Sequence, residues 1–481
     1  MEKTLKQKTA QALIWTLIDR FGQQMLAFAV GLVLARFYLS PDDYGLMGMI
    51  AIFTALGAIL LDSGFSNALV RKKEISQADL SSVFYFNLGA GIVLYILLFF
   101  AAPFIADFYH QPRLITITRV AALPFLINPF TLIQWVNLTR DLNFKVITIS
   151  GFIALFCSAA VGLSLAMNGF GVWALVYQHI TFLLVRAVCF WLYTSWHPSW
   201  LFDKQCIKEL WKFSSNILMI NVLHALFYNL YVALVGRFYP LRDVGYYAQA
   251  DKFSALSAGS LSTALQTATY PILAKIGDDE ERFQRAIRKI MRVSAFIVLP
   301  ALFGLSAAAE PLVQLLLTDK WAAIVPYLQK LAIAWVFIVF MNLHNNMLYV
   351  RNKARTALYL ECGKKSLILL CALIAIPLNL SIAVTCLLAA HLVGFIVSAI
   401  VVAKQANYSI LCQLKDIFPY FCIAATMATG VYCLSFCFDN NLMLIAVQLV
   451  GGTLFYLGAA YLLGSKVLRE VMGVLKIKSI K

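Results

Sequence analysis

Four polar side chains stand together inside the first long apolar run of the sequence, residues 12–38. They are Asp19, Arg20, Gln23 and Gln24. In a helix Asp19 shares a face with Gln23, and Arg20 shares the adjacent face with Gln24. An ionisable residue within a membrane costs about 2.5–3.5 kcal/mol on insertion scales, so such residues are functional candidates by default. We expect these four to line a polar cavity; structural pairing of the aspartate with the arginine is the alternative.

A second polar stripe lies in the seventh apolar run, where Asn221, His224 and Tyr228 are spaced i, i+3 and i+7. This spacing puts all three on one helix face. A lone histidine on an apolar helix is usually structural. Here, however, the sequence contains an internal repeat, described below, in which this stripe is equivalent to the position of Asp19. This equivalence favours a cavity-facing role for His224. Because its ordinary pKa lies near neutrality, His224 is a candidate proton carrier.

Two further runs carry polar groups. His179 and Arg186, seven residues apart, share a face of the sixth run, and Arg186 lies too deep to extend easily to the surface. We expect Arg186 to contact an anion. Gln249, Asp251 and Lys252 lie near the outer end of the eighth run, either at a cavity rim or in a salt bridge.

Polar residues also occur near the inner ends of later runs. Lys364 and Lys365 are expected to attract the anionic inner leaflet, with pyrophosphate as the alternative ligand. Four residues of the tenth run are expected to be solvated by the adjoining loop: Asn342, His344, Asn345 and Asn346.

Motifs for catalysis do not occur in the sequence. It contains no P-loop, HExxH or GxSxG pattern and no carboxylate-rich external loop. We therefore expect a protein that is not an enzyme, with no cofactor, no metal and no nucleotide as its energy source.

The composition identifies the elements that must position these side chains. Hydrophobic residues make up 61% of the 481 and charged residues 13%, about half the charged share of a soluble domain. Continuous apolar runs of about twenty residues predict membrane-spanning helices, and so an all-α fold. We predict fourteen spans, at 12–38, 43–62, 80–102, 114–138, 147–168, 170–194, 213–236, 245–271, 290–317, 323–350, 360–379, 381–403, 415–437 and 441–464.

The formal net charge is +16, and the positions of the basic residues along the chain indicate which loops are cytoplasmic. With the N-terminus placed in the cytoplasm, 29 basic residues fall in cytoplasmic loops and tails and four in external loops. This asymmetry predicts that both termini are cytoplasmic. Because the cations are spread over short loops between spans, no nucleic-acid partner is expected.

An internal repeat is visible at an offset of about 200 residues. Arg36-Phe37-Tyr38 precedes a proline turn, an aspartate and Gly45, and Arg237-Phe238-Tyr239 precedes the same features and Gly245. The repeat predicts two six-helix halves that have the same orientation in the membrane. They would be related by an axis along the membrane normal, as in transporters with parallel repeats. We place the halves at 1–200 and 201–408 and two added helices with a basic tail at 409–481.

Several stretches of the sequence resemble the polysaccharide transporter family of the superfamily that contains multidrug extrusion pumps and lipid II flippases. They include Asp43-Tyr44-Gly45-Leu46-Met47-Gly48-Met49, residues 62–72, 83–87, 102–109 and 140–145, and, in the second half, 244–252 and 270–273. The likeness is strongest over 40–145 and specific for the family rather than for a sugar.

The resemblance implies a flippase of the bacterial inner membrane that moves undecaprenyl-pyrophosphate-linked oligosaccharides outward by alternating access. Its partners would be this lipid-linked oligosaccharide, membrane lipid, a coupling ion (H⁺ or Na⁺) if one is used, and polysaccharide-assembly proteins. The two added helices would help to form a groove for the lipid tail. Arg20 and Arg186 would neutralise the pyrophosphate, so alanine at either is expected to abolish export.

Three alternatives remain. An ion-coupled multidrug exporter would favour an acidic cavity, whereas the embedded charges here are mixed to basic. A polymerase or ligase for lipid-linked sugars would carry a large external loop. A scaffold would not need polar stripes inside apolar helices.

Overall fold

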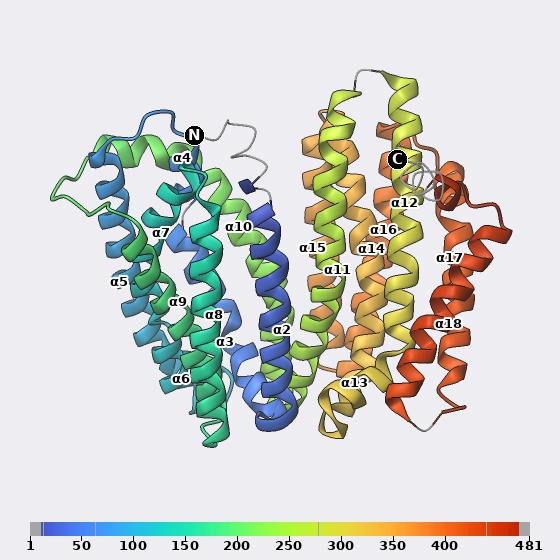
Figure 1. Ribbon diagram of the computed structural model, residues 1–481, viewed down its shortest axis with the longest axis horizontal. Helices are drawn as coiled ribbons and strands as arrows, with labels where there is room; N and C mark the ends of the chain where they lie inside the picture. The colour runs from blue at the N-terminus through green and yellow to red at the C-terminus, as the bar shows by residue number, and fades with distance from the viewer. Residues whose placement is uncertain (1–10, 13, 63, 278, 439, 471–481) are drawn as a thin grey trace. The chain divides into compact units, whose positions relative to one another are not determined.

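The computed structural model describes residues 11–12, 14–62, 64–277, 279–438 and 440–470 (Figure 1). The basic tails fall outside these ranges: Lys3, Lys6 and Lys8 at the N-terminus, and Lys476, Lys478 and Lys481 at the C-terminus.

The described residues form helices and no strands, which confirms the predicted all-α class. They divide into two compact units, Met1–Gly245 and Tyr246–Lys481. The first contains η1 (Ile18–Gly22), α2 (Gln23–Val33), η2 (Leu34–Tyr38), α3 (Pro41–Asp62), α4 (Phe65–Arg71), α5 (Gln77–Phe108), α6 (Leu114–Ala121), α7 (Pro124–Arg140), α8 (Phe144–Met167), α9 (Val172–Tyr193), α10 (Lys204–Phe238) and the start of α11 (Leu241–Lys275).

The second unit holds the rest of α11 and the following helices: α12 (Glu280–Ala307), α13 (Ala309–Leu317), η3 (Asp319–Ile324), α14 (Val325–Val350), α15 (Ala354–Ala375), α16 (Leu380–Gln405), α17 (Ile410–Leu434) and α18 (Asn441–Leu462). The division at Gly245 reflects packing, since α10 packs against α3. The repeat boundaries given above describe sequence similarity and stay a prediction.

Twelve helical segments of the described residues are long and apolar enough to cross a membrane, so the chain is a multi-pass membrane protein. The long helices α11 and α15 fall outside this group. Helix α11 is rich in Ser, Thr and Gln, and α15 contains Glu361, Lys364 and Lys365. The count of fourteen spans therefore stays a prediction.

Several predicted spans differ from the helices at their ends. The span at 80–102 is part of the longer α5. The span at 114–138 is divided between α6 and α7, and the span at 290–317 between α12 and α13. Hydropathy detects only the apolar part of a helix, whereas the helices continue into polar segments. Where a helix begins or ends depends on capping residues and proline, which hydropathy does not detect.

Local signals explain where helices begin. Ser76 and Asp79 form a capping box at the start of α5, each side chain accepting a hydrogen bond from the other's backbone N–H. The side chains of Asn379 and Asn440 cap α16 and α18 by accepting hydrogen bonds from two backbone N–H groups each. Such caps fix the register of the polar residues along each span.

The two glycines that the repeat makes equivalent lie against each other. A side chain on Gly45 would collide with the backbone oxygen of Leu241, and one on Gly245 would collide with that of Pro41. Helices α3 and α11 approach this closely at their N-termini because neither position carries a Cβ atom.

Candidate functional site

The side chains around Asp19 form a polar cluster in the first unit. Asp19 lies in η1, a single π-helical turn, and such turns are frequent at functional sites. The amide Nε2 of Gln23 donates to Asp19 Oδ1 at 2.5 Å. Thr148 of α8 lies nearby, and its hydroxyl donates to the backbone oxygens of Trp15 and Phe144. Gln23 packs over Gly151, where any side chain would collide with its amide. The first span, which contains η1 and α2, and helix α8 therefore surround this carboxylate.

Arg186 of α9 joins the cluster from a distance in the sequence. It interacts electrostatically with Asp19, but no ion pair within 4.0 Å connects the two in the described part of the chain. Its guanidinium carbon lies 5.1 Å from the centre of the Phe190 ring, and its buried Nε has no hydrogen-bond partner among the described residues. A half-buried guanidinium that retains free donors can bind phosphate or carboxylate oxygens.

The other residues expected near this site are more exposed. Arg20 is exposed, and no hydrogen bond or ion pair connects it to the cluster within the described ranges. His179 is also exposed, and Gln24 is half-buried. Of the residues expected in the first and sixth spans, the fold thus brings Asp19, Gln23 and Arg186 together.

The polar stripe of the seventh span lies on α10, and all three of its residues are exposed. The rings of His224 and Tyr228 stack 6.4 Å apart at an interplanar angle of 15°. Asn221 lies one turn before His224 on the same helix. In α11, Gln249 is buried, Asp251 is half-buried and Lys252 is exposed. That these residues line a cavity stays a prediction.

A buried polar network in the second unit is largely absent from the sequence-based expectations. Helix α14 contributes four of its residues, and the expectation that they are solvated by a loop is wrong for the three that are buried, His344, Asn345 and Asn346. His344 Nδ1 lies 2.8 Å from the Ser398 hydroxyl, and Asn346 donates to Thr269 of α11 at 3.2 Å.

The fourth residue, Asn342, is half-buried and donates to Ser262 of α11 at 3.1 Å. These contacts explain why α14 tolerates four polar residues in its inner half: helices α11, α15 and α16 supply their partners.

Glu361 of α15 is the centre of this network. It accepts from Asn345 at 3.0 Å and from Lys364 at 2.6 Å, and His391 of α16 lies close enough to interact with both charges. Lys364 is therefore paired within the protein and only 14% exposed. Sequence reasoning missed Glu361 and His391, although an acid three residues before a lysine inside an apolar run is a detectable signal.

An apolar groove of about 540 Å³ runs along the second unit. Its walls come from α11, α12, α13, α17 and α18, with Phe296, Pro300, Met427, Gly452 and Tyr456 among its lining residues. The predicted role of the last two helices in binding a lipid tail requires such a slot, and stays a prediction. The described residues contain no group of three or more His, Cys, Asp or Glu that could hold a metal ion.

Comparison with solved structures defines the class of fold. The chain is similar to the lipid II flippase MurJ in its inward closed conformation, with a TM-score of 0.78 and 16% identity over 95% of this chain and 100% of that one. It is also similar to an inward-facing multidrug resistance MATE transporter of the MOP superfamily, with a TM-score of 0.62 and 14% identity over 83% and 99% of the two chains. The fold is that of the MOP superfamily transporters.

Sequence comparison narrows the class to a family. The profile of the polysaccharide biosynthesis protein family matches residues 33–326, more than half of the chain, and the chain belongs to this family. Relatives include the teichuronic acid biosynthesis protein TuaB of Bacillus subtilis, 25% identical over 84% of this chain and 85% of TuaB. The succinoglycan biosynthesis transport protein ExoT of Rhizobium meliloti is 25% identical over 69% of this chain and 68% of its own length.

A third relative is the lipopolysaccharide biosynthesis protein WzxC of Escherichia coli, 25% identical over 69% of this chain and 67% of WzxC. The resemblance expected from the sequence is thereby confirmed.

Proposed function

We propose that this protein flips undecaprenyl-pyrophosphate-linked oligosaccharides from the cytoplasmic to the periplasmic leaflet of a bacterial inner membrane, with both termini in the cytoplasm. Membership of the polysaccharide biosynthesis family gives the substrate class, and ExoT is named as a transport protein. The likeness to a lipid II flippase gives a fold on which lipid-linked sugars are moved. On this proposal the protein binds and releases its substrate without making or breaking a covalent bond.

The observation that carries the proposal is the polar cluster of the first unit. A pyrophosphate in a low-dielectric cavity must be neutralised, because an isolated buried charge is prohibitively costly. Arg186 supplies a guanidinium whose Nε is buried and unpartnered among the described residues, and Asp19 and Gln23 hold the opposite side of the cluster. An arginine stays charged and can bind two phosphate oxygens at once.

A multidrug exporter is the competing function, since MATE transporters share the fold. Such a pump moves cationic compounds and would place acids where this chain places Arg186 beside Asp19. The two functions therefore differ in the charge of the substrate, which is cationic for a multidrug exporter and anionic for the proposed flippase.

Coupling to H⁺ or Na⁺ is proposed at Glu361. This carboxylate is half-buried and interacts with Asn345, Lys364 and His391, so it can exchange an ion or a proton for these internal partners.

Complementation tests the main proposal. A strain that lacks its own flippase and fails to display surface polysaccharide is supplied with the wild-type protein or with Arg186→Ala. We expect the wild type to restore the polysaccharide and Arg186→Ala to fail at the same membrane level. Arg113→Ala, at an exposed arginine outside the cluster, serves as the control and should restore it. Full export by Arg186→Ala would contradict the proposal and favour the multidrug alternative.

A further inference from the structure

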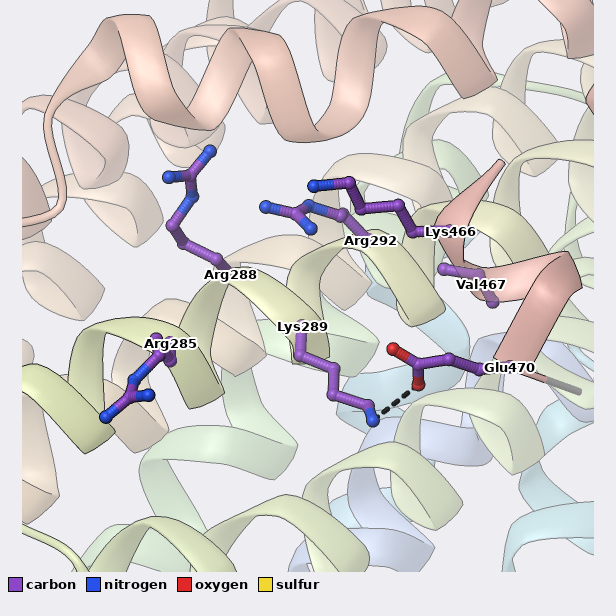
Figure 2. A pocket seen from close by; sticks show the side chains of 7 residues that line it. All are labelled: Arg285, Arg288, Lys289, Arg292, Lys466, Val467 and Glu470. Atoms are coloured by element: carbon purple, nitrogen blue, oxygen red, sulfur yellow. Dashed lines mark ion pairs between the residues drawn. The ribbon is translucent and has the colours of Figure 1, made fainter. Parts of the chain in front are cut away.

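A cationic pocket lies in the second unit between α12 and the segment that follows α18. It has a volume of about 260 Å³. Figure 2 shows the residues that line it: Arg285, Arg288, Lys289, Arg292, Lys466, Val467 and Glu470. This pocket belongs to neither the Asp19 cluster nor the Glu361 network, and the positive-inside pattern places it at the cytoplasmic end of the unit.

The four cations of α12 lie on a single helix face. Arg285, Arg288, Lys289 and Arg292 are spaced i, i+3, i+4 and i+7, so their side chains project in one direction. Topology alone requires basic residues at a helix end but does not require them on one face. The alignment therefore concentrates positive charge on one side of the pocket.

Acids inside the protein balance only part of this charge. Asp416 of α17, 2% exposed, accepts from Arg288 Nε at 2.9 Å and from Arg292 Nε at 2.6 Å. Lys289 pairs with Glu470 at 2.5 Å.

Arg285 pairs with Glu281 at 3.5 Å, and Lys466 has no ion pair among the described residues. Among the described residues, five cations thus face three acids, which leaves an excess charge of +2 around the pocket.

Asp416 also orients the arginines. It receives hydrogen bonds from the Nε of both guanidinium groups and from the Tyr408 hydroxyl at 3.0 Å. The terminal nitrogens of Arg292 have no hydrogen-bond acceptor in the described ranges, which leaves two donors for an external ligand. Two such donors match the oxygens of a phosphate group.

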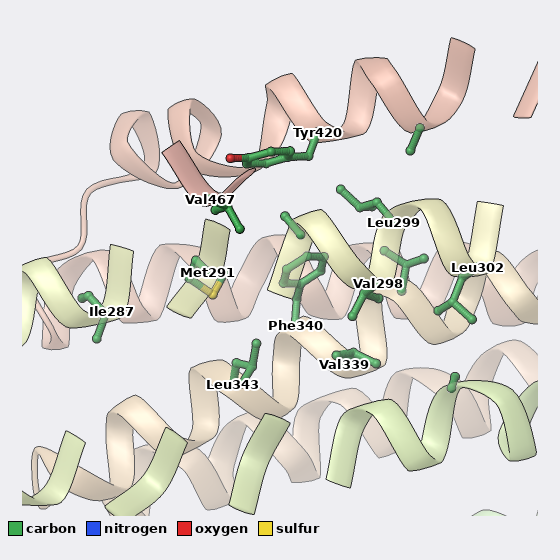
Figure 3. Close-up of a cluster of buried hydrophobic side chains, with 14 of the residues drawn as sticks. Ile287, Met291, Val298, Leu299, Leu302, Val339, Phe340, Leu343, Tyr420 and Val467 are labelled. Carbon is green, nitrogen blue, oxygen red and sulfur yellow. The ribbon is translucent and has the colours of Figure 1, made fainter. Parts of the chain in front are cut away.

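The opposite wall of the pocket is fixed by packing. Val467, 6% exposed, belongs to the buried cluster that contains Met291 of α12, Phe340 of α14 and Tyr420 of α17 (Figure 3). The Tyr420 hydroxyl lies 3.0 Å from the Ser465 hydroxyl. Lys466, between these two anchored residues, is therefore held beside the arginines, as Figure 2 shows.

The pocket lies close to the apolar groove of the second unit. The groove described above begins at Phe296, one helical turn from Arg292, or about 6 Å along α12. The pocket therefore lies where apolar surface gives way to charged surface, which is the depth of lipid headgroups. Its volume is below the about 300–1,000 Å³ of clefts for drug-sized ligands, so it suits a phosphate headgroup rather than an oligosaccharide.

We infer that this pocket binds the phosphate group of an anionic phospholipid of the cytoplasmic leaflet. Arg292 and Lys466 contact the phosphate oxygens directly, while Arg288 and Lys289 attract the phosphate through their positive charge without contacting it. Binding of the lipid joins α12 to the segment after α18 and thereby stabilises the second unit. The site is separate from the proposed transport site and does not depend on the transport function.

Thermal unfolding of the purified full-length protein in detergent tests the inference. Phosphatidylglycerol and phosphatidylcholine are titrated separately, and the unfolding temperature reports saturation. We expect phosphatidylglycerol to stabilise the wild type at lower mole fraction than phosphatidylcholine. Lys466→Gln should weaken the apparent affinity for phosphatidylglycerol about fivefold, and Lys289→Gln/Lys466→Gln about 25-fold, since each basic residue near an anionic surface contributes about 1 kcal/mol.

Lys404→Gln is the matched control, because this exposed lysine of α16 does not line the pocket. It should leave the phosphatidylglycerol titration unchanged. Equal stabilisation by the two phospholipids, or wild-type affinity in the double variant, would overturn the inference. Inorganic phosphate that stabilises as strongly as the lipid at equal concentration would also overturn it. A preference for undecaprenyl pyrophosphate over phosphatidylglycerol would refute the phospholipid as the ligand.

Discussion

Two carboxylates, one in each unit, differ in how many hydrogen bonds they accept from protein side chains. Asp416 is almost fully buried and receives hydrogen bonds from Arg288, Arg292 and Tyr408. Asp19 is half-buried and bonded to Gln23, and the arginine nearest to it, Arg186, leaves its Nε unpartnered in the described part of the chain.

The difference separates two roles of a charge within a membrane protein. A carboxylate saturated by arginines from a neighbouring helix joins helices, because removing either partner leaves a buried charge uncompensated. Arg186, in contrast, makes no ion pair within 4.0 Å with Asp19 in the described part of the chain, so its donors are available to a ligand. We therefore expect substitutions at Asp416 to affect stability and substitutions around Asp19 to affect transport.

The largest effect is expected at Asp416. Asp416→Ala leaves Arg288 and Arg292 without the carboxylate that pairs with both, which should cost about 3–5 kcal/mol of folding free energy. The unfolding temperature in detergent and the amount of protein in the membrane measure this cost. Asp416→Asn, which keeps one acceptor oxygen, should lie between the alanine variant and the wild type. An alanine variant as stable as the wild type would remove the contrast between the two clusters.

Arg186→Ala should have the next largest effect, this time on transport. We expect export to fall at least about tenfold, since a charge-assisted hydrogen bond contributes about 1.5–3 kcal/mol. The unfolding temperature should change little. Arg186→Lys keeps the charge but loses the planar fork, so it should restore export in part. The measurement is surface polysaccharide, normalised to the amount of the transporter in the membrane. If Arg186→Ala destabilises the protein but its folded fraction exports normally, the assignment of Arg186 to substrate binding is contradicted.

Gln23→Leu should have a smaller effect. It keeps approximately the volume that packs over Gly151 but removes the amide that donates to Asp19. The loss of one hydrogen bond in a three-helix cluster should reduce export a few-fold, by about 1 kcal/mol. Gln23→Glu, which places a second acid beside Asp19, should be worse than leucine. The same export assay ranks the two, and the reverse order would argue against an anionic substrate at this cluster.

The smallest effect is expected at Arg20. The sequence alone ranks Arg20 with Arg186, but Arg20 is exposed and no hydrogen bond or ion pair within the described ranges ties it to Asp19. Arg20→Ala should therefore change stability by less than about 0.5 kcal/mol and lower export less than Arg186→Ala does. If Arg20→Ala abolishes export while Arg186→Ala does not, the site lies on the exposed face of the first span.

The helical class, the position of most spans and the family could be predicted from the amino-acid sequence. These depend on local properties: the length of apolar runs, the caps of each helix and the residues at turns. The Asp19–Gln23 contact is of the same kind, because side chains four residues apart in a helix are neighbours whatever surrounds them. Hydropathy was least informative for α11 and α15, where polar residues belong to the interior.

Tertiary structure decided which polar residues have partners. Arg186 lies near Asp19 only because α9 and η1 both pack against α8. Asp416 meets Arg288 and Arg292 only because α12 packs against α17. His344 is buried rather than loop-solvated because Ser398 on α16 supplies its partner. A sequence gives the spacing of polar residues along one helix, but burial and hydrogen bonding depend on the neighbouring helices, which lie far away in the chain.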